Sequence, residues 1–182
     1  FQMAKLSPQD GEATYRFGTS VAIHETTVVI GAQNSETASR SGAAYIFDHV
    51  DGTWQQTAKL APNDLNARDG FGQSVSIDGA HIAVGSPAER SRDHSGSVYT
   101  FSLLNGRWQQ TAKLTVADGE PGDALGYSVA IDGLTVLAGA IDDDTEGHRG
   151  AGSASIFEME SEPVCLGNGA CLCVEGVGGA LC

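Results

Sequence analysis

Hydrophobic and polar residues alternate along most of this chain, and short turns interrupt the alternation. Residues 74–86 read SVSIDGAHIAVGS, in which Val75 and Ile77 share one face and further apolar residues alternate after the turn. A period of two is typical of β-strands. An Asp-Gly pair between two such runs favours a β-hairpin, because both central residues of a type I′ turn need a positive φ. We therefore predict a hairpin here with Asp78-Gly79 at its turn.

The same hairpin pattern occurs three times, and each copy is followed by further strands. Residues 20–32 and 128–140 repeat it, with His24-Glu25 and Asp132-Gly133 at the turns. No run of ten or more residues has helical spacing, so each unit is predicted to be a four-stranded antiparallel meander in an all-β fold. The predicted third strands are 42–48, 96–102 and 152–158, and the predicted fourth strands are 53–60 and 107–114, reached through turns at Asp51-Gly52 and Asn105-Gly106.

The units repeat with a strict period of 54 residues, which brings Phe17-Gly18 onto Phe71-Gly72 and Leu125-Gly126. A strict period of this length indicates one supersecondary unit copied several times, with each copy burying its apolar face against its neighbours. A repeated four-stranded meander is typical of a β-propeller blade. Other positions in register are Gly31, Gly85 and Gly139, Lys5-Leu6, Lys59-Leu60 and Lys113-Leu114, and Trp54 and Trp108.

The predicted blades cover about residues 7–60, 61–114 and 115–160, and residues 161–182 form a separate tail. Residues 2–6 (QMAKL) match the fourth strand of a unit, whereas the last unit stops after its third strand near Glu158. Three blades closed by the N-terminal strand are one interpretation. Propellers have at least four blades, however, so we expect part of a larger ring or an assembly of several chains, with residues 2–6 a strand of a neighbouring blade.

Two strings carry a family resemblance: FGQSVSIDGAHIAVGSP followed by SGSVYTF, and FGTSVAIHETTVVIGAQ followed by SGAAYIF. They resemble FG-GAP repeats, the blades of integrin alpha propellers and of many microbial surface proteins, over roughly residues 2–158. The third copy departs from the pattern, with Leu125 in place of Phe and Gly139-Ala140-Ile141 in place of the Gly-Ala-Pro-like turn. The resemblance implies a secreted or cell-surface propeller for binding or adhesion, not an enzyme.

The net charge of the chain limits the classes of partner that it is expected to bind. The formal net charge is -13, with ten Lys and Arg residues in all. Nucleic acids and anionic membrane surfaces bind clusters of basic residues, so both are disfavoured as partners. No apolar stretch approaches the roughly 20 residues of a membrane helix, so we expect no membrane insertion. The N-terminus shows no basic region followed by an apolar run, so a secretion signal would be removed or lie upstream.

Four cysteines lie in the tail, at Cys165, Cys171, Cys173 and Cys182. Four cysteines allow three disulfide connectivities, and a zinc site is the alternative, although Cys-x-Cys is an unusual zinc spacing and no histidine is near. A segment this short has almost no core and needs cross-links, which form outside the cell. The segment also resembles the C-terminal half of an EGF-like module, which implies pairing of Cys173 with Cys182 and of Cys165 with Cys171.

An acidic loop in the third unit is the candidate metal site. Asp142, Asp144 and Glu146 alternate in the sequence AIDDDTEGHRGAG. Calcium takes six to eight oxygen ligands, and a loop rich in carboxylates can supply them. Integrin-type repeats carry their calcium loop between the same strands, and that resemblance implies the same role here. The alternative is a solvated acidic loop that aids solubility.

Other acidic residues recur with the repeat and indicate structural roles. Asp10, Asp64 and Asp118 are in register, and Asp69 and Asp123 are in register in the last two copies. Catalysis needs one site and not three, so these residues are interpreted as turn-capping groups such as those of Asx-turns. No Gly-x-Ser-x-Gly elbow and no strand-to-helix phosphate loop is present, so we expect no enzyme activity.

Two functions remain open at this point. The first is a structural protein of an extracellular layer, appendage or filament, in which blades pack chain against chain. The second is a calcium-dependent, integrin-like adhesion propeller. Both functions imply that the binding partners are other protein chains. For the repeat core, Phe17, Phe71 and Leu125 are predicted to be buried at equivalent positions, and the predicted residues at blade interfaces are Tyr45, Phe47, Tyr99, Phe101 and Phe157.

Overall fold

The computed structural model describes residues 1–10, 16–33, 41–66, 68–87, 94–145, 147–160, 164–166 and 170–172. Its regular elements are all strands, and in this part of the chain no helix could cross a membrane. The strands are β1 (Phe17–His24), β2 (Thr27–Ala32), β3 (Ala43–Val50), β4 (Thr53–Leu60), β5 (Ser74–Asp78), β6 (His81–Ser86), β7 (Ser97–Leu104), β8 (Arg107–Leu114), β9 (Leu125–Asp132), β10 (Thr135–Ala140), β11 (Ser153–Glu158), β12 (Val164–Leu166) and β13 (Ala170–Leu172).

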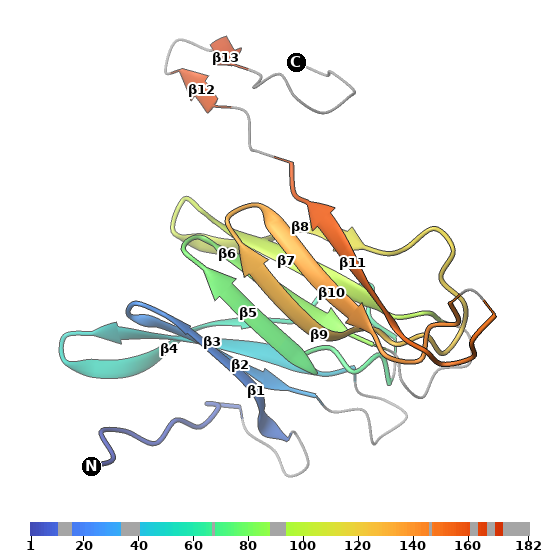
Figure 1. The fold of residues 1–182 in the computed structure, drawn as a ribbon. Coiled ribbons are helices and arrows are strands. Elements are labelled where there is room, and N and C mark those ends of the chain that lie inside the picture. The colour runs from blue at the N-terminus through green and yellow to red at the C-terminus, as the bar shows by residue number, and fades with distance from the viewer. Residues whose placement is uncertain are drawn as a thin grey trace.

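The strands form three antiparallel meanders in chain order, as the sequence predicts. Blade 1 is the sheet β1-β2-β3-β4 and blade 2 is the sheet β5-β6-β7-β8. In the part of the chain that the structure describes, blade 3 has the strands β9, β10 and β11, while β12 and β13 form a separate pair. In Figure 1 the sheets stack face to face, with blade 2 between blade 1 and blade 3. The described blades therefore form an open row and not a closed ring.

The first hairpin turn of each blade differs from the prediction by one residue. Asp78 pairs with His81, so the central turn residues are Gly79 and Ala80, and of these two only Gly79 has a positive φ. The Asp78 carboxylate instead bonds to a neighbouring blade, since Oδ2 accepts the Gly133 N–H at 2.7 Å. The other two first turns are shifted in the same way, with the positive φ at Glu25 and Gly133.

The turns between the third and fourth strands are as predicted. Asp51 and Gly52 have φ values of 49° and 77°, and Asn105 and Gly106 have values of 51° and 73°. Two consecutive positive φ values are the requirement of a type I′ turn. These turns fix the register of β4 and β8, whose ends coincide with the predicted ones.

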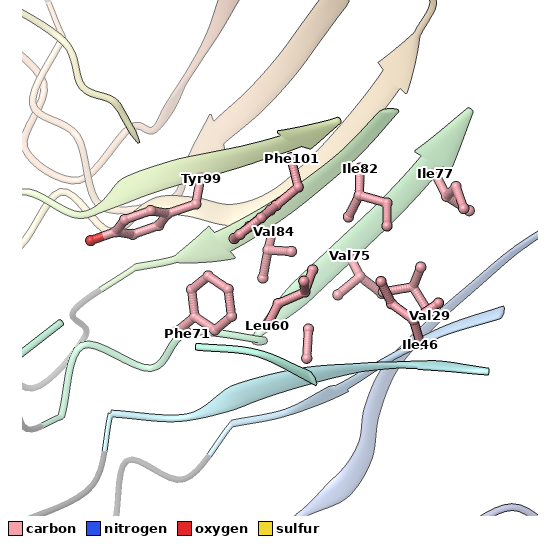
Figure 2. Packing of buried hydrophobic residues seen from close by; sticks show 11 residues of the cluster. Val29, Ile46, Leu60, Phe71, Val75, Ile77, Ile82, Val84, Tyr99 and Phe101 are labelled. Atoms are coloured by element: carbon pink, nitrogen blue, oxygen red, sulfur yellow. The ribbon is translucent and has the colours of Figure 1, made fainter. Parts of the chain in front are cut away.

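Apolar side chains fill the spaces between successive blades. Between blade 1 and blade 2, Val29 and Ile46 of blade 1 meet Val75 and Ile77 of β5, and Phe71 closes one end of the cluster (Figure 2). A second cluster joins blade 2 to blade 3 through Ala83, Val98, Leu125, Val136, Ala138 and Ala140. Burying a side chain of the size of valine or isoleucine contributes roughly 1.5–3 kcal/mol, so the row of blades is held together mainly by these layers.

Candidate functional site

The joint between neighbouring blades is built around the Phe-Gly pair of each repeat. The Phe71 N–H donates to the Ser41 carbonyl of blade 1 at 2.8 Å. The Ser20 hydroxyl of blade 1 donates to the Gly72 carbonyl at 2.9 Å. One repeat later, the Leu125 N–H and the Ser95 carbonyl form the same bond at 2.8 Å. The corresponding Ser74–Gly126 bond is 2.8 Å long. Equivalent backbone and serine atoms therefore form the same joint between blades 1 and 2 and between blades 2 and 3.

Glycine is required at this joint because two backbones approach closely. A Cβ at Gly31 would overlap the Gly72 carbonyl, and a Cβ at Gly85 would overlap the Gly126 carbonyl. Gly72 and Gly126 have φ values of 90° and 88°, which L-residues with a Cβ rarely adopt. The recurring glycines of the sequence pattern therefore permit blade-to-blade contact.

Each end of the row carries one half of this joint without the other. On blade 1, a Cβ at Gly18 would meet nothing within 4 Å among the described atoms, although Gly18 has a φ of 93° like its equivalents. On blade 3, a Cβ at Gly139 would contact only Ser128 of its own blade. Phe17-Gly18 of blade 1 and Ser128 and Gly139 of blade 3 are therefore complementary half-joints.

The faces around these half-joints are apolar and exposed. Val21 and Ile23 on blade 1 are 67% and 65% exposed, whereas their equivalents in blade 2, Val75 and Ile77, are each 8% exposed. We call Val21 and Ile23, with the neighbouring Phe17, the leading face. The exposure of Val21 and Ile23 has a simple cause, since no described blade lies against them.

Blade 3 shows the same contrast on its opposite side. Leu137 and Ile156 are 44% and 70% exposed, whereas their equivalents in blade 1, Val29 and Ile46, are fully buried. We call Leu137 and Ile156, with Ser128 and Gly139, the trailing face. In blades 1 and 2 the equivalent side chains contact the next blade, so both faces have the composition of a blade interface.

How deeply each predicted core residue is buried depends on the place of its blade in the row. Phe71 and Leu125 are fully buried, and Phe71 contacts Tyr99 edge to face with ring centroids 5.4 Å apart. Phe17 makes the equivalent contact with Tyr45 at 5.5 Å but is only half-buried. This differs from the prediction of equal burial, because no described blade covers Phe17. Tyr45, Phe47, Tyr99 and Phe101 are buried, while Trp54, Trp108 and Phe157 are partly buried at the cluster edges.

A tyrosine, a lysine and an aspartate form a polar group on blade 2 that sequence reasoning missed. Lys113 Nζ donates to Asp64 Oδ2 at 2.9 Å, the Tyr99 hydroxyl donates to the same oxygen at 3.2 Å, and the Lys113 ammonium lies 5.1 Å from the centre of the Tyr99 ring. On blade 1, Lys59 likewise donates to Asp10 and lies over the Tyr45 ring, but the Tyr45 hydroxyl has no hydrogen-bond partner among the described residues. Both pairs join the segment that leads into a blade to that blade's fourth strand.

These contacts shift the pKa values of the groups. The hydrogen bond from Lys113 holds the pKa of Asp64 below its ordinary value, and burial raises the pKa of the Tyr99 hydroxyl. Burial is the largest influence on the pKa of Lys113 and lowers it, but the hydrogen bonds with Tyr99 and Asp64 outweigh burial, so the pKa is raised. The shifts of Asp64 and Lys113 favour a charged pair across the neutral pH range, and the shift of Tyr99 keeps its hydroxyl neutral.

Asp69 and Asp123 cap backbone groups, as their recurrence indicates. Asp69 Oδ2 accepts the Asn66 N–H at 2.7 Å, and Asp123 Oδ2 accepts the Glu120 N–H at 2.6 Å. The other oxygen of Asp69 is buried without a partner, and Asp69 lines a polar cavity of about 270 Å³ together with Ser86 and Ser97. This cavity was not predicted from the sequence, because its walls come from strands of blade 2 and from the loops around them.

The candidate calcium ligands lie in the β10–β11 loop of blade 3. Asp144 Oδ1 accepts the Gly150 N–H at 2.7 Å, and the Asp142 N–H donates to the Asp123 carbonyl. Glu146 lies outside the described residues. Within the described ranges, no group of three or more acidic, histidine or cysteine side chains is placed to hold a metal ion. The calcium site stays a prediction.

Of the two predicted disulfide pairs, the cysteines of one, Cys165 and Cys171, lie in the described part of the tail. The β12–β13 register places Cys165 opposite Cys171, and directly opposed residues of an antiparallel pair have the Cα separation that a disulfide needs. Cys173 and Cys182 lie outside the described residues. Disulfide pairing in the tail therefore stays a prediction.

The repeated joints lead to a comparison with known families. A sequence model of the FG-GAP repeat matches three segments, residues 1–47, 54–101 and 108–157. The chain belongs to the FG-GAP repeat family. Each match to the FG-GAP repeat includes one Phe-Gly or Leu-Gly pair and the three strands that follow or contain it. No curated protein matches the chain.

Proposed function

We propose that this FG-GAP protein is a non-enzymatic, extracellular assembly protein whose blades pack chain against chain in a surface layer, appendage or filament. The observation that carries the proposal is the pair of unfilled half-joints at the two ends of the row. The leading face and the trailing face present the two complementary sides of an interface that the chain itself makes twice.

The exposed side chains supply the driving force. Val21, Ile23, Leu137 and Ile156 are all large and apolar, and each is at least 44% exposed. Burial of one such side chain contributes roughly 1.5–3 kcal/mol. These side chains form two exposed apolar faces, one at each end of the row, and exposed apolar faces of this kind mark interaction sites.

The polar groups of the half-joints supply specificity. In the two joints within the chain, a serine hydroxyl donates to a glycine carbonyl, and a backbone N–H donates to the carbonyl before the third strand. A blade that docks on the trailing face can offer the same carbonyl to Ser128. A partner without a Phe-Gly pair would offer no carbonyl to the Ser128 hydroxyl and no backbone that could approach Gly139 closely. The faces therefore favour another FG-GAP blade as the partner.

The extracellular assignment is supported by the cysteines. All four lie in the tail and the blades contain none, which suits a small cross-linked segment formed in an oxidising compartment. Thiol titration of protein purified from its native source without reductant tests this part: no free thiols are expected, and four free thiols would contradict it.

The assembly proposal is tested by altering one face. Ile23→Asp places a charge at the centre of the leading face, and Val50→Asp is the matched control because Val50 is also exposed but lies at the β3–β4 turn. Self-association is measured by sedimentation equilibrium. Ile23→Asp should abolish self-association and Val50→Asp should leave it intact. Equal behaviour of the two variants would contradict the proposal.

A further inference from the structure

Among the described residues, no fourth strand lies at the outer edge of blade 3, whereas the other two blades each have one. β4 pairs along β3 and β8 pairs along β7, while the sheet of blade 3 has the order β11-β10-β9. The edge of β11 therefore presents backbone N–H and carbonyl groups in a row, which favours pairing with a further strand.

The N-terminal segment has the sequence of the missing strand. Residues 2–6 read QMAKL, and the ends of β4 and β8 both read QTAKL. Residues 2–5 are exposed and belong to no sheet. Leu6 and Phe17 both pack against the outer cluster of blade 1, as Leu60 and Phe71 both belong to the cluster between blade 1 and blade 2. The segment thus lies against blade 1 as the fourth strand of a preceding blade would.

We propose that residues 2–6 of one copy pair with β11 of a second copy and complete its blade 3. This inference rests on the proposed function, and it names the partner as a second copy of this chain. The register follows from blade 2, where Lys113 is opposite Tyr99 and Ala112 is opposite Thr100. By the repeat, Lys5 pairs opposite Ser155 and Ala4 opposite Ile156.

Charge complementarity supports this register. Asp10 and Asp64, each leading into a blade, bind Lys59 and Lys113 on the fourth strand of that blade. Asp118 is the equivalent residue before blade 3, and the equivalent lysine on the donated strand is Lys5. Among the described residues, neither Asp118 nor Lys5 has an ion-pair partner. Pairing of the two copies joins these two charges.

The same docking fills both open faces at once. With β11 of the second copy beside residues 2–6, its Leu137 and Ile156 lie over Val21 and Ile23 of the first copy. Its Ser128 hydroxyl then donates to the Gly18 carbonyl, as Ser20 and Ser74 donate within the chain. Within one chain, blade 2 separates the N-terminal segment from β11 (Figure 1), so the strand comes from another copy.

The test uses charge reversal in the full chain. Lys5→Asp and Asp118→Lys each place like charges together across the interface, and Arg107→Asp is the control for Lys5→Asp because it makes the same charge change at the exposed β7–β8 turn. Sedimentation equilibrium should show self-association weakened about 5- to 10-fold by each of the first two variants. Arg107→Asp should have little effect, and the thermal midpoint of each variant checks its folding.

Mixing the two weakened variants is the decisive step. An equimolar mixture of Lys5→Asp and Asp118→Lys should regain the wild-type affinity, because the new aspartate of one variant then faces the new lysine of the other. If the wild-type chain associates but neither reversal weakens it, or if mixing restores nothing, the strand pairing is wrong while the assembly proposal stands. A wild-type chain that stays monomeric overturns both.

Discussion

Blade 2 and the two outer blades are built from nearly the same sequence, yet their faces have opposite environments. Val75 and Ile77 of blade 2 are buried by blade 1, whereas Val21 and Ile23 at the same repeat positions of blade 1 are exposed. The residue types do not differ, so the difference comes from the neighbour alone. A blade of this family is therefore a unit whose core is completed by the next blade, wherever that blade comes from.

The largest expected effect compares two equivalent aromatic residues. Phe71→Ala should lower the free energy of unfolding by about 3–5 kcal/mol, because the side chain is fully buried between two blades. Phe17→Ala should cost markedly less in the monomer, since one side of Phe17 is open. Urea denaturation of both variants measures the difference. Equal losses would mean that Phe17 is also covered in solution.

Calcium tests whether blade 3 carries a function that the other blades lack. If Asp142, Asp144 and Glu146 bind calcium, the ion should stabilise the fold by about 2.7 kcal/mol at 100 times the dissociation constant. The thermal midpoint should then rise with calcium and stay constant in Asp144→Asn. Magnesium at the same concentration is the control for ionic strength. An unchanged midpoint at millimolar calcium would leave the loop as a solvated acidic segment.

The glycines of the joints allow a comparison at one repeat position. Gly85→Ala should destabilise the protein by about 1–3 kcal/mol, because the new Cβ would overlap the Gly126 carbonyl of the next blade. Gly139→Ala should cost less, since its Cβ meets only the Ser128 side chain. Thermal unfolding at low protein concentration measures both. In the assembled state Gly139→Ala should also weaken self-association.

The smallest expected effect concerns the aspartates that lead into the blades. Asp64→Asn should lower the free energy of unfolding by less than about 1 kcal/mol, as expected for a partly exposed ion pair. Asp118→Asn should have almost no effect in the monomer, because Asp118 has no lysine partner in the described structure. A similar loss of unfolding free energy in both variants would contradict a stabilising ion pair between Asp64 and Lys113.

The pH dependence of this pair follows from the shift at Asp64. Its pKa is lower in the folded state than the ordinary value of 3.8, so the stabilisation is present above pH 3.8 and is lost as pH falls through the folded pKa. The difference in stability between wild type and Asp64→Asn should therefore be constant near neutral pH and shrink at acidic pH. Unfolding by urea, which is uncharged and does not screen the ion pair, measures this difference at several pH values.

The sequence predicted those features that depend on local patterns. The strands β4 and β8 and their type I′ turns coincide with the prediction, because alternation and consecutive turn residues specify them locally. The first hairpin turns are all shifted by one residue, and in blade 2 the Asp78 carboxylate bonds to Gly133 in another blade. A single run of residues carries no sign of such a partner.

The candidate interaction surface was only partly visible in the sequence. The missing fourth strand and the matching N-terminal segment follow from the repeat count. The pairs Lys59–Asp10 and Lys113–Asp64 did not, because each joins residues that are close only after the meander has folded. The half-joints also needed the structure, since the close approach of Gly85 to the Gly126 carbonyl is a contact between blades.

The decisive measurement is the solution mass of the wild-type chain as a function of protein concentration. If the open faces of different copies bury each other, the mass should rise above the 18.8 kDa of one chain as the concentration increases. A mass of one chain at every concentration up to the millimolar range would contradict it.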